Sequence, residues 1–350
     1  CATTAFTVGI EQAVPQAAER LRLWLLVFSA VFFAAALLFS LFPGKILTWV
    51  GKILNPFFLL FLGILIIVAL VKPSAAISAV APEGAYASQA FSTGFLEGYN
   101  TMDVLAGLAF GIIVVQVIRE LGVTDADAVA SSTVKAGVFS SLLMALIYLA
   151  VTVVGAQSRG LFATSENGGI ALAQIARHYL GSAGLVILAA TVTLACLKTS
   201  VGLITSCAET FCGMFPKGPG YRAWAVLFTL ISFALSNFGL STIISYSVPV
   251  LMFLYPLAIA LVLLALFGRF YRHDRAVYIS VIVCTLLAAL YDLICALPEG
   301  LYDALHADAV QAFGLRVLPF AGAGLGWICP LVLGFVIGLA VHLMQKFRTK

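Results

Sequence analysis

The stretch GFLEGYNTMDVLAGLAFG, residues 94–111, places polar groups and glycines directly before the apolar run IIVVQVI. Its hydroxyl, amide and carboxylate groups come from Tyr99, Asn100, Thr101 and Asp103. Glycines such as Gly98 lower helix propensity and let a ligand approach the backbone closely. Unwound backbone at membrane depth is tolerated where it lines a cavity or is buried in protein, and a helix N-terminus there favours an anion such as a carboxylate. The alternative interpretation is that the acids mark the aqueous start of a helix and the glycines serve helix packing.

A second stretch, LACLKTSVGLITSCAETF at 194–211, places Cys196, Thr199 and Ser200 at helical positions i, i+3 and i+4. Residues at this spacing lie close together on one helix surface. Two hydroxyl oxygens and the Cys196 backbone carbonyl suit a hard cation such as sodium. Alternatively, the hydroxyls bond to carbonyls of their own helix or pack against a neighbouring helix.

Lys198 lies in the middle of the same apolar run. A charge at that depth costs about 3 kcal/mol or more, so the side chain should face a cavity or a counter-charge. Asp103 and Asp292 are candidate counter-charges, and the sequence does not choose between them. Lys198 would then be a fixed cation that tunes an ion site; the alternative is a lysine that reaches a cytoplasmic vestibule filled with water.

The elements that must position these residues are membrane helices. Hydrophobic residues make up 62% of the 350 residues and charged residues 10%, with a net charge of +4 and a mean hydropathy of +1.10. This composition predicts an all-α polytopic membrane protein. Runs long enough for the roughly 20 residues that cross a bilayer occupy 22–42, 46–71, 96–118, 134–155, 183–211, 223–240, 243–267, 276–296 and 323–345. We expect aqueous loops at 73–93, 157–180 and 298–320, which are rich in Gly, Pro, Ser and acidic residues.

The distribution of Lys and Arg orients these spans. When the C-terminal QKFRTK is placed in the cytoplasm, alternation of the spans puts most basic residues on the same side, including the cluster Arg269, Arg272 and Arg275. This bias agrees with the positive-inside rule and predicts a cytoplasmic C-terminus. The first residues, CATTAFTVGI, read like the end of a helix, so we expect that the chain is a fragment lacking an N-terminal part.

Several classes of function are disfavoured by the residues. The seven cysteines form no CxxC pair, and only one of the four histidines, His342, lies within a span. A metal centre, a haem subunit and a disulfide framework are therefore not expected. No Walker A or GxSxG motif and no basic aromatic tract for nucleic acid is present. We expect neither an enzyme nor a bound cofactor.

The two stretches described above, followed by SNFGLSTIISYSVPVLMFLYP at 236–256, resemble the bacterial branched-chain amino acid transporters of the BrnQ, or LIV-II, type. The resemblance covers essentially the whole chain. It implies a symporter that imports leucine, isoleucine or valine together with sodium across the bacterial plasma membrane. It also implies the LeuT-like fold of two five-helix inverted repeats and two trailing helices, without its first two helices and most of the third. Residues 1–71 would be the remainder of the first repeat, 96–267 the second repeat, and 276–345 the trailing helices.

The resemblance also implies site residues. Gly98, Tyr99, Asn100, Thr101, Asp103 and Phe110 would bind the amino acid substrate. Sodium would be bound by the Cys196 carbonyl and by the hydroxyls of Thr199 and Ser200. Lys198 lies beside these ligands and is a departure that leaves the identity of the coupling ion, sodium or proton, open. The alternatives that remain open are a proton-coupled carrier of another small neutral solute, a ligand-sensing membrane receptor of similar fold, and a structural membrane subunit of an enzyme complex.

Overall fold

The computed structural model describes residues 1–11, 18–42 and 45–348. Within these ranges the regular structure is entirely helical. The chain divides into two compact units, each made of two chain segments. Residues 1–81 and 109–243 form the first unit, and residues 82–108 and 244–350 form the second. Each unit has its own packed helices and its own buried clusters.

The first unit is organised around one long helix, α7 (Gly168–Met214). Asn167 begins it, because its side-chain oxygen accepts hydrogen bonds from the N–H groups of Gly169 and Ile170, each at 3.1 Å. Gly181 interrupts the helical backbone with φ +65°, a conformation that glycine adopts without steric cost. The helices of this unit that contact α7 are α1 (Ala2–Gly9), α2 (Ala18–Leu41), α3 (Lys45–Val71), α6 (Ala126–Ser158) and α8 (Tyr221–Ser236).

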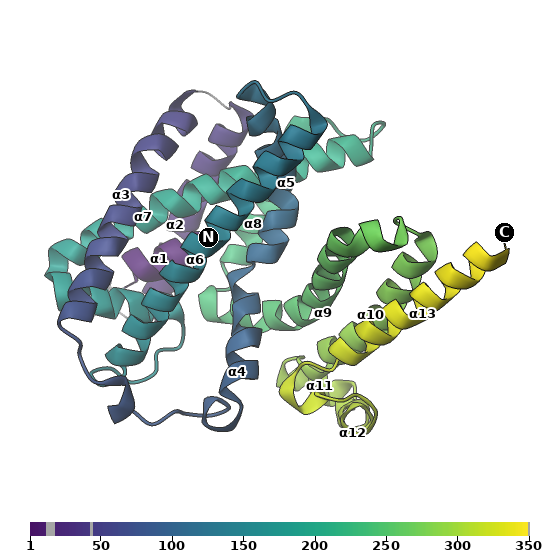
Figure 1. The fold of residues 1–350 in the computed structure, drawn as a ribbon. Coiled ribbons are helices and arrows are strands. Elements are labelled where there is room, and N and C mark those ends of the chain that lie inside the picture. Colours follow the sequence, from purple (N-terminus) through teal and green to yellow (C-terminus); the bar gives the residue numbers. More distant parts are fainter. Residues whose placement is uncertain (12–17, 43–44, 349–350) are drawn as a thin grey trace. The chain divides into compact units, whose positions relative to one another are not determined.

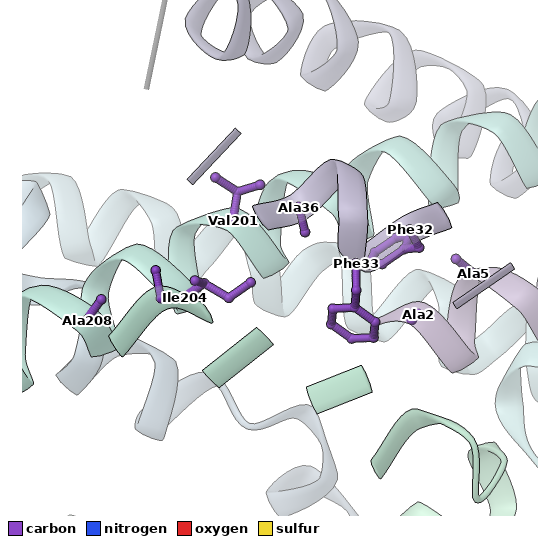
Figure 2. Packing of buried hydrophobic residues seen from close by; sticks show 9 residues of the cluster. Ala2, Ala5, Phe32, Phe33, Ala36, Val201, Ile204 and Ala208 are labelled. Carbon is purple, nitrogen blue, oxygen red and sulfur yellow. The ribbon is translucent and has the colours of Figure 1, made fainter. Parts of the chain in front are cut away.

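Figure 2 shows the buried cluster between α1, α2 and α7 in this unit. Phe32 and Phe33 of α2 are buried there together with Val201 and Ile204 of α7. Alanines fill the remaining positions: Ala2, Ala5, Ala36, Ala208 and Ala225. Small side chains let helix backbones approach closely, which is how helices associate in a membrane, where the lipid is as apolar as the core.

The second unit is built around the helix pair α10 (Arg275–Cys295) and α13 (Ile328–Arg348), which run side by side. Two glycines allow this close contact. A Cβ atom would lie 2.7 Å from Val281 Cα at Gly334, and 2.6 Å from Val277 Cα at Gly338. The unit also contains α4 (Tyr86–Glu97), the 3₁₀ turn η2 (Gly98–Thr101), α11 (Glu299–Ala304) and α12 (Ala307–Val317). Two helices, α5 (Asp103–Glu120) and α9 (Leu240–Phe267), have residues in both units.

Helices overlap each apolar run expected from the sequence, but the run 96–118 is divided between α4, η2 and α5, and in the described part of the chain fewer helices than the nine expected meet the length and hydropathy criterion for a span. Within the described residues, six helices are long and apolar enough to cross a membrane, and the bent pair of helices from Tyr86 to Glu120 is either a seventh, broken span or a re-entrant loop. The apolar part of α3, Pro56–Val71, and helix α8 are shorter than this criterion. The chain is therefore a polytopic helical membrane protein.

The three segments predicted to be irregular loops each contain helical structure, so this prediction was wrong. Residues 73–93 include the 3₁₀ turn η1 (Ile77–Ala79) and the start of α4, and residues 157–180 include the start of α7. Residues 298–320 contain α11 and α12. Glycine and polar residues in these segments predict irregular structure. Helices form there nevertheless, because capping residues such as Asn167 and contacts such as that between α12 and α10 stabilise them.

Candidate substrate and ion sites

The polar stretch at 94–111 contains a real break in helical geometry. Helix α4 ends at Glu97, the backbone then forms the 3₁₀ turn η2, and Met102 adopts a left-handed conformation with φ +59° and ψ +15°. Helix α5 begins at the next residue, Asp103. A left-handed conformation costs a non-glycine residue roughly 1–2 kcal/mol, so surrounding contacts must hold Met102 in place.

Local hydrogen bonds define the shape of this break. The Thr101 hydroxyl donates to the Gly98 carbonyl at 2.8 Å, and the Asp103 N–H lies 3.5 Å from the same hydroxyl oxygen. The Asn100 amide donates to the Glu97 carboxylate at 2.8 Å. Asn100 and Thr101 are exposed, and Asp103 is half-buried in the first turn of α5. The structure thus gathers five of the six expected substrate residues in one short turn at a helix N-terminus.

An aromatic stack anchors the break within the second unit. Tyr99 of η2 is buried, and its ring stacks on Tyr255 of α9 with centroids 4.2 Å apart and planes 13° apart. Phe95 meets the Tyr99 ring edge to face. The Tyr255 hydroxyl lies against Thr101, Met102 and Val104, the residues where the chain turns into α5. Stacked aromatic pairs contribute about 0.5–1.5 kcal/mol beyond burial, which helps to hold the unwound backbone.

The residues of the expected ion site lie on an uninterrupted part of α7 in the first unit. The Thr199 hydroxyl donates to the Ala195 carbonyl of its own helix at 3.0 Å, as the alternative interpretation anticipates. This bond uses the hydroxyl proton and leaves the oxygen able to accept or to bind a cation. Within the described residues, no group of three or more His, Cys, Asp and Glu side chains is arranged to hold a metal ion.

Ser200 has a different environment from Thr199. Its side chain is buried, whereas that of Thr199 is exposed. Ser200 lines a cavity of about 300 Å³ within the first unit, together with Cys207 of the same helix and Ser236 of α8. Of the two hydroxyls that the sequence singles out, that of Ser200 borders this partly open cavity.

Two further expected residues, Lys198 and Phe110, belong to the first unit. Lys198 is half-buried, and the described residues place no carboxylate in a salt bridge with it. Phe110 packs on α7: a Cβ atom added to Gly202 would lie 3.3 Å from the Phe110 ring. Pairing of Lys198 with Asp103 or Asp292, and a shared site of Phe110 with residues 98–103, stay predictions.

Sequence reasoning missed the aromatic partners of Tyr99. Tyr255 lies beside Pro256 in a stretch whose hydroxyl residues and prolines are more conspicuous than its tyrosine. Trp327 follows a glycine-rich segment before α13. The indole of Trp327 lies next to the Tyr99 hydroxyl. The only available signal was that tyrosine and tryptophan carry polar atoms that need partners when they are buried.

A polytopic helical membrane protein with polar unwound backbone inside a span has the architecture of a carrier for small solutes. Residues 1–345 match the family model described as branched-chain amino acid transport protein, and the chain belongs to this family. It is 49% identical over 346 residues to the branched-chain amino acid permease BrnQ of Lactobacillus delbrueckii subsp. lactis, which covers 99% of this chain and 76% of that protein.

Other relatives have the same kind of name. The chain is 36% identical to the branched-chain amino acid permease BrnQ of Bacillus subtilis, over 99% of this chain and 75% of that protein. It is 37% identical to the permease BrnQ of Escherichia coli, over 97% of this chain and 73% of that protein. No solved structure matches the chain. These relatives are named as permeases and not as enzymes, so the chain is a membrane transport protein.

Proposed function

We propose that the protein is a secondary active symporter that imports leucine, isoleucine and valine together with sodium. Its family and the names of its relatives support the substrate class. The observation that carries the mechanism is the break between α4 and α5, where helical hydrogen bonding stops within a span. Freed backbone groups at such a break are ligands for the charged ends of an amino acid.

The substrate's two charged groups would bind at different parts of the break. The N-terminus of α5 presents backbone N–H groups and the positive end of the helix dipole to the carboxylate. Gly98, Tyr99, Asn100 and Thr101 frame that end, and the Asp103 carboxylate is a counter-charge for the substrate ammonium group. An apolar pocket that includes Phe110 would hold the branched side chain. Such a pocket distinguishes one methylene group by only about 1–3 kcal/mol, so all three amino acids would be carried.

Sodium would bind on α7. The Cys196 carbonyl and the hydroxyls of Thr199 and Ser200 supply oxygen ligands. The cavity lined by Ser200 supports this assignment, because an ion needs space beside its ligands. Lys198 would weaken or tune the site by repulsion. In the LeuT-like fold that we propose, residues 1–71 belong to the first repeat, 96–267 form the second and 276–345 the trailing helices, with the C-terminus in the cytoplasm.

Uptake of radiolabelled leucine into proteoliposomes, with and without an inward sodium gradient, tests this function. We expect sodium-driven accumulation that excess isoleucine or valine suppresses and excess lysine does not. Accumulation that follows an imposed proton gradient in sodium-free buffer would overturn sodium coupling. Saturable leucine binding without accumulation would indicate a receptor, and neither binding nor uptake by folded protein would overturn the substrate class.

A further inference from the structure

Asp292 is a buried acid that the proposed transport mechanism does not use. It lies in the last turn of α10, and its side chain is only 7% exposed. Within the part of the chain that the structure describes, its Oδ2 atom has no hydrogen-bond partner. The C-terminal turn of a helix carries the negative end of the helix dipole, so this position disfavours a carboxylate still further.

The groups around Asp292 are neutral, and Tyr291 and Tyr302 among them are hydrogen-bonded to other residues. Among the described residues, the Tyr99 hydroxyl of η2 and the Trp327 indole N–H are both buried without a hydrogen-bond partner. Tyr99 lies next to Trp327 and interacts electrostatically with Asp292. Tyr291 and Cys295 of α10 also interact electrostatically with the Asp292 carboxyl group. Tyr302 of α11 interacts in turn with Tyr291 and Cys295. Tyr255 of α9 is stacked on Tyr99. None of these groups is cationic at neutral pH.

The environment of the Asp292 carboxyl group favours a proton over a metal cation as its ligand. An unpaired carboxylate is strongly disfavoured away from water, and it is relieved by a counter-ion or by a proton. A metal cation needs several oxygen ligands around a space of its own. Here the Tyr99 and Tyr255 rings are in direct stacking contact, and the Trp327 indole only donates. A proton needs one oxygen atom and no cavity, and it removes the charge of the buried carboxyl group.

We propose that Asp292 is a proton-binding site, and that its occupancy is coupled through Tyr99 to the conformation of the break at Gly98–Met102. The coupling rests on the proposed function, because it assumes that substrate binds at this break. Proton binding itself does not. The step is a simple transfer: the proton comes from water, forms the O–H bond of the acid, and returns to water when Tyr99 moves and water reaches the carboxyl group.

Infrared spectroscopy tests the site directly, because a protonated carboxylic acid has a C=O stretching band that a carboxylate lacks. The experiment uses the complete protein in lipid at neutral pH. We expect the wild type to show this band, Asp292→Asn to lose it, and the control Asp303→Asn, which changes an exposed acid on α11, to keep it. A wild type without the band, or a band that survives in Asp292→Asn, would overturn the proposal. Loss of the band on adding sodium chloride would show a metal-cation site instead.

Tyr99→Phe and added leucine test the coupling. Tyr99→Phe keeps the aromatic stack but removes the hydroxyl that interacts electrostatically with Asp292, so we expect the band to shift while the protein stays folded. In the wild type, leucine should shift the band or remove it. A band that leucine and Tyr99→Phe both leave unchanged would overturn the coupling. Absence of leucine binding and uptake with the band present would overturn the proposed function and leave the proton site standing.

Discussion

The break at Gly98–Met102 and the helical segment Cys196–Ser200 both carry polar residues inside apolar stretches, but they treat the backbone differently. At the break, the chain leaves the α-helix, and Met102 adopts a left-handed conformation. On α7 the helix is intact, and the Thr199 hydroxyl bonds to the carbonyl four residues earlier. The first region exposes backbone groups. The second offers side-chain oxygens and carbonyl oxygens that, in an intact helix, already accept one hydrogen bond and keep a second lone pair.

The difference shows what each region can bind. A break presents N–H groups and a helix end, which suit the charged ends of an amino acid. An intact helix presents hydroxyls at i and i+1 and suits a small cation with ligands from another element. The Tyr99–Tyr255 stack offsets part of the free-energy cost of unwinding the backbone at the break. The α7 segment needs no such support, because it keeps its helical backbone.

The largest expected effect comes from removing the support of the break. Tyr99→Ala deletes a buried, stacked ring, and large-to-small aromatic substitutions in a core cost about 3–5 kcal/mol. We expect a marked fall in the thermal denaturation midpoint of the purified protein. Tyr246→Ala, which removes an exposed ring on α9, is the matched control and should change it little. Equal midpoints for the two variants would contradict a supporting role of the stack.

The ion-site side of the comparison is tested with Thr199→Ala. If Thr199 binds sodium, the sodium concentration for half-maximal uptake should rise about tenfold, a loss of about 1.4 kcal/mol, with little change in expression. Thr210→Ala is a close control, because Thr210 is also exposed on α7 and donates to the Ser206 carbonyl at 2.7 Å. If both variants keep wild-type sodium affinity, Thr199 has only the helix-internal bond.

Backbone strain at the break gives a smaller effect of opposite sign. Met102→Gly removes the Cβ atom that disfavours φ +59°, so relief of strain should stabilise this conformation by up to about 1 kcal/mol. We expect an equal or slightly higher denaturation midpoint. Met144→Gly places the same change in the middle of the regular helix α6 and should lower it. A lower midpoint for Met102→Gly would show that the Met102 side chain matters more than its backbone.

The smallest expected effect is a pH dependence away from both regions. Asp274 caps α10, and hydrogen bonds from the neighbouring His342 imidazole and the Ala276 N–H hold the pKa of the Asp274 carboxyl below its ordinary value. A carboxyl group with a lowered pKa in the folded state stabilises the protein above its unfolded pKa and loses this contribution as the pH falls through the folded pKa. We therefore expect a fall in denaturation midpoint below about pH 4. Asp274→Asn keeps a capping side chain and should flatten this dependence.

Much of the fold follows from local properties of the chain. Apolar runs such as 243–267 and 276–296 are helices in the structure, because backbone groups in lipid must be bonded within their own segment. The polar composition of 98–103 likewise indicated a disturbed helix. The short helices α11 and α12 were missed, because their capping and packing are not visible as an apolar period.

The sequence by itself determined that this protein is helical, spans a membrane and carries polar residues at two places within it, since transfer free energy and hydrogen bonding act residue by residue. Only the tertiary structure decided which polar atoms lack partners. Tyr99, Tyr255, Asp292 and Trp327 are far apart along the chain, yet they are buried in the same compact unit. Their burial in one unit depends on how the helices pack, which the pattern of any single segment does not encode.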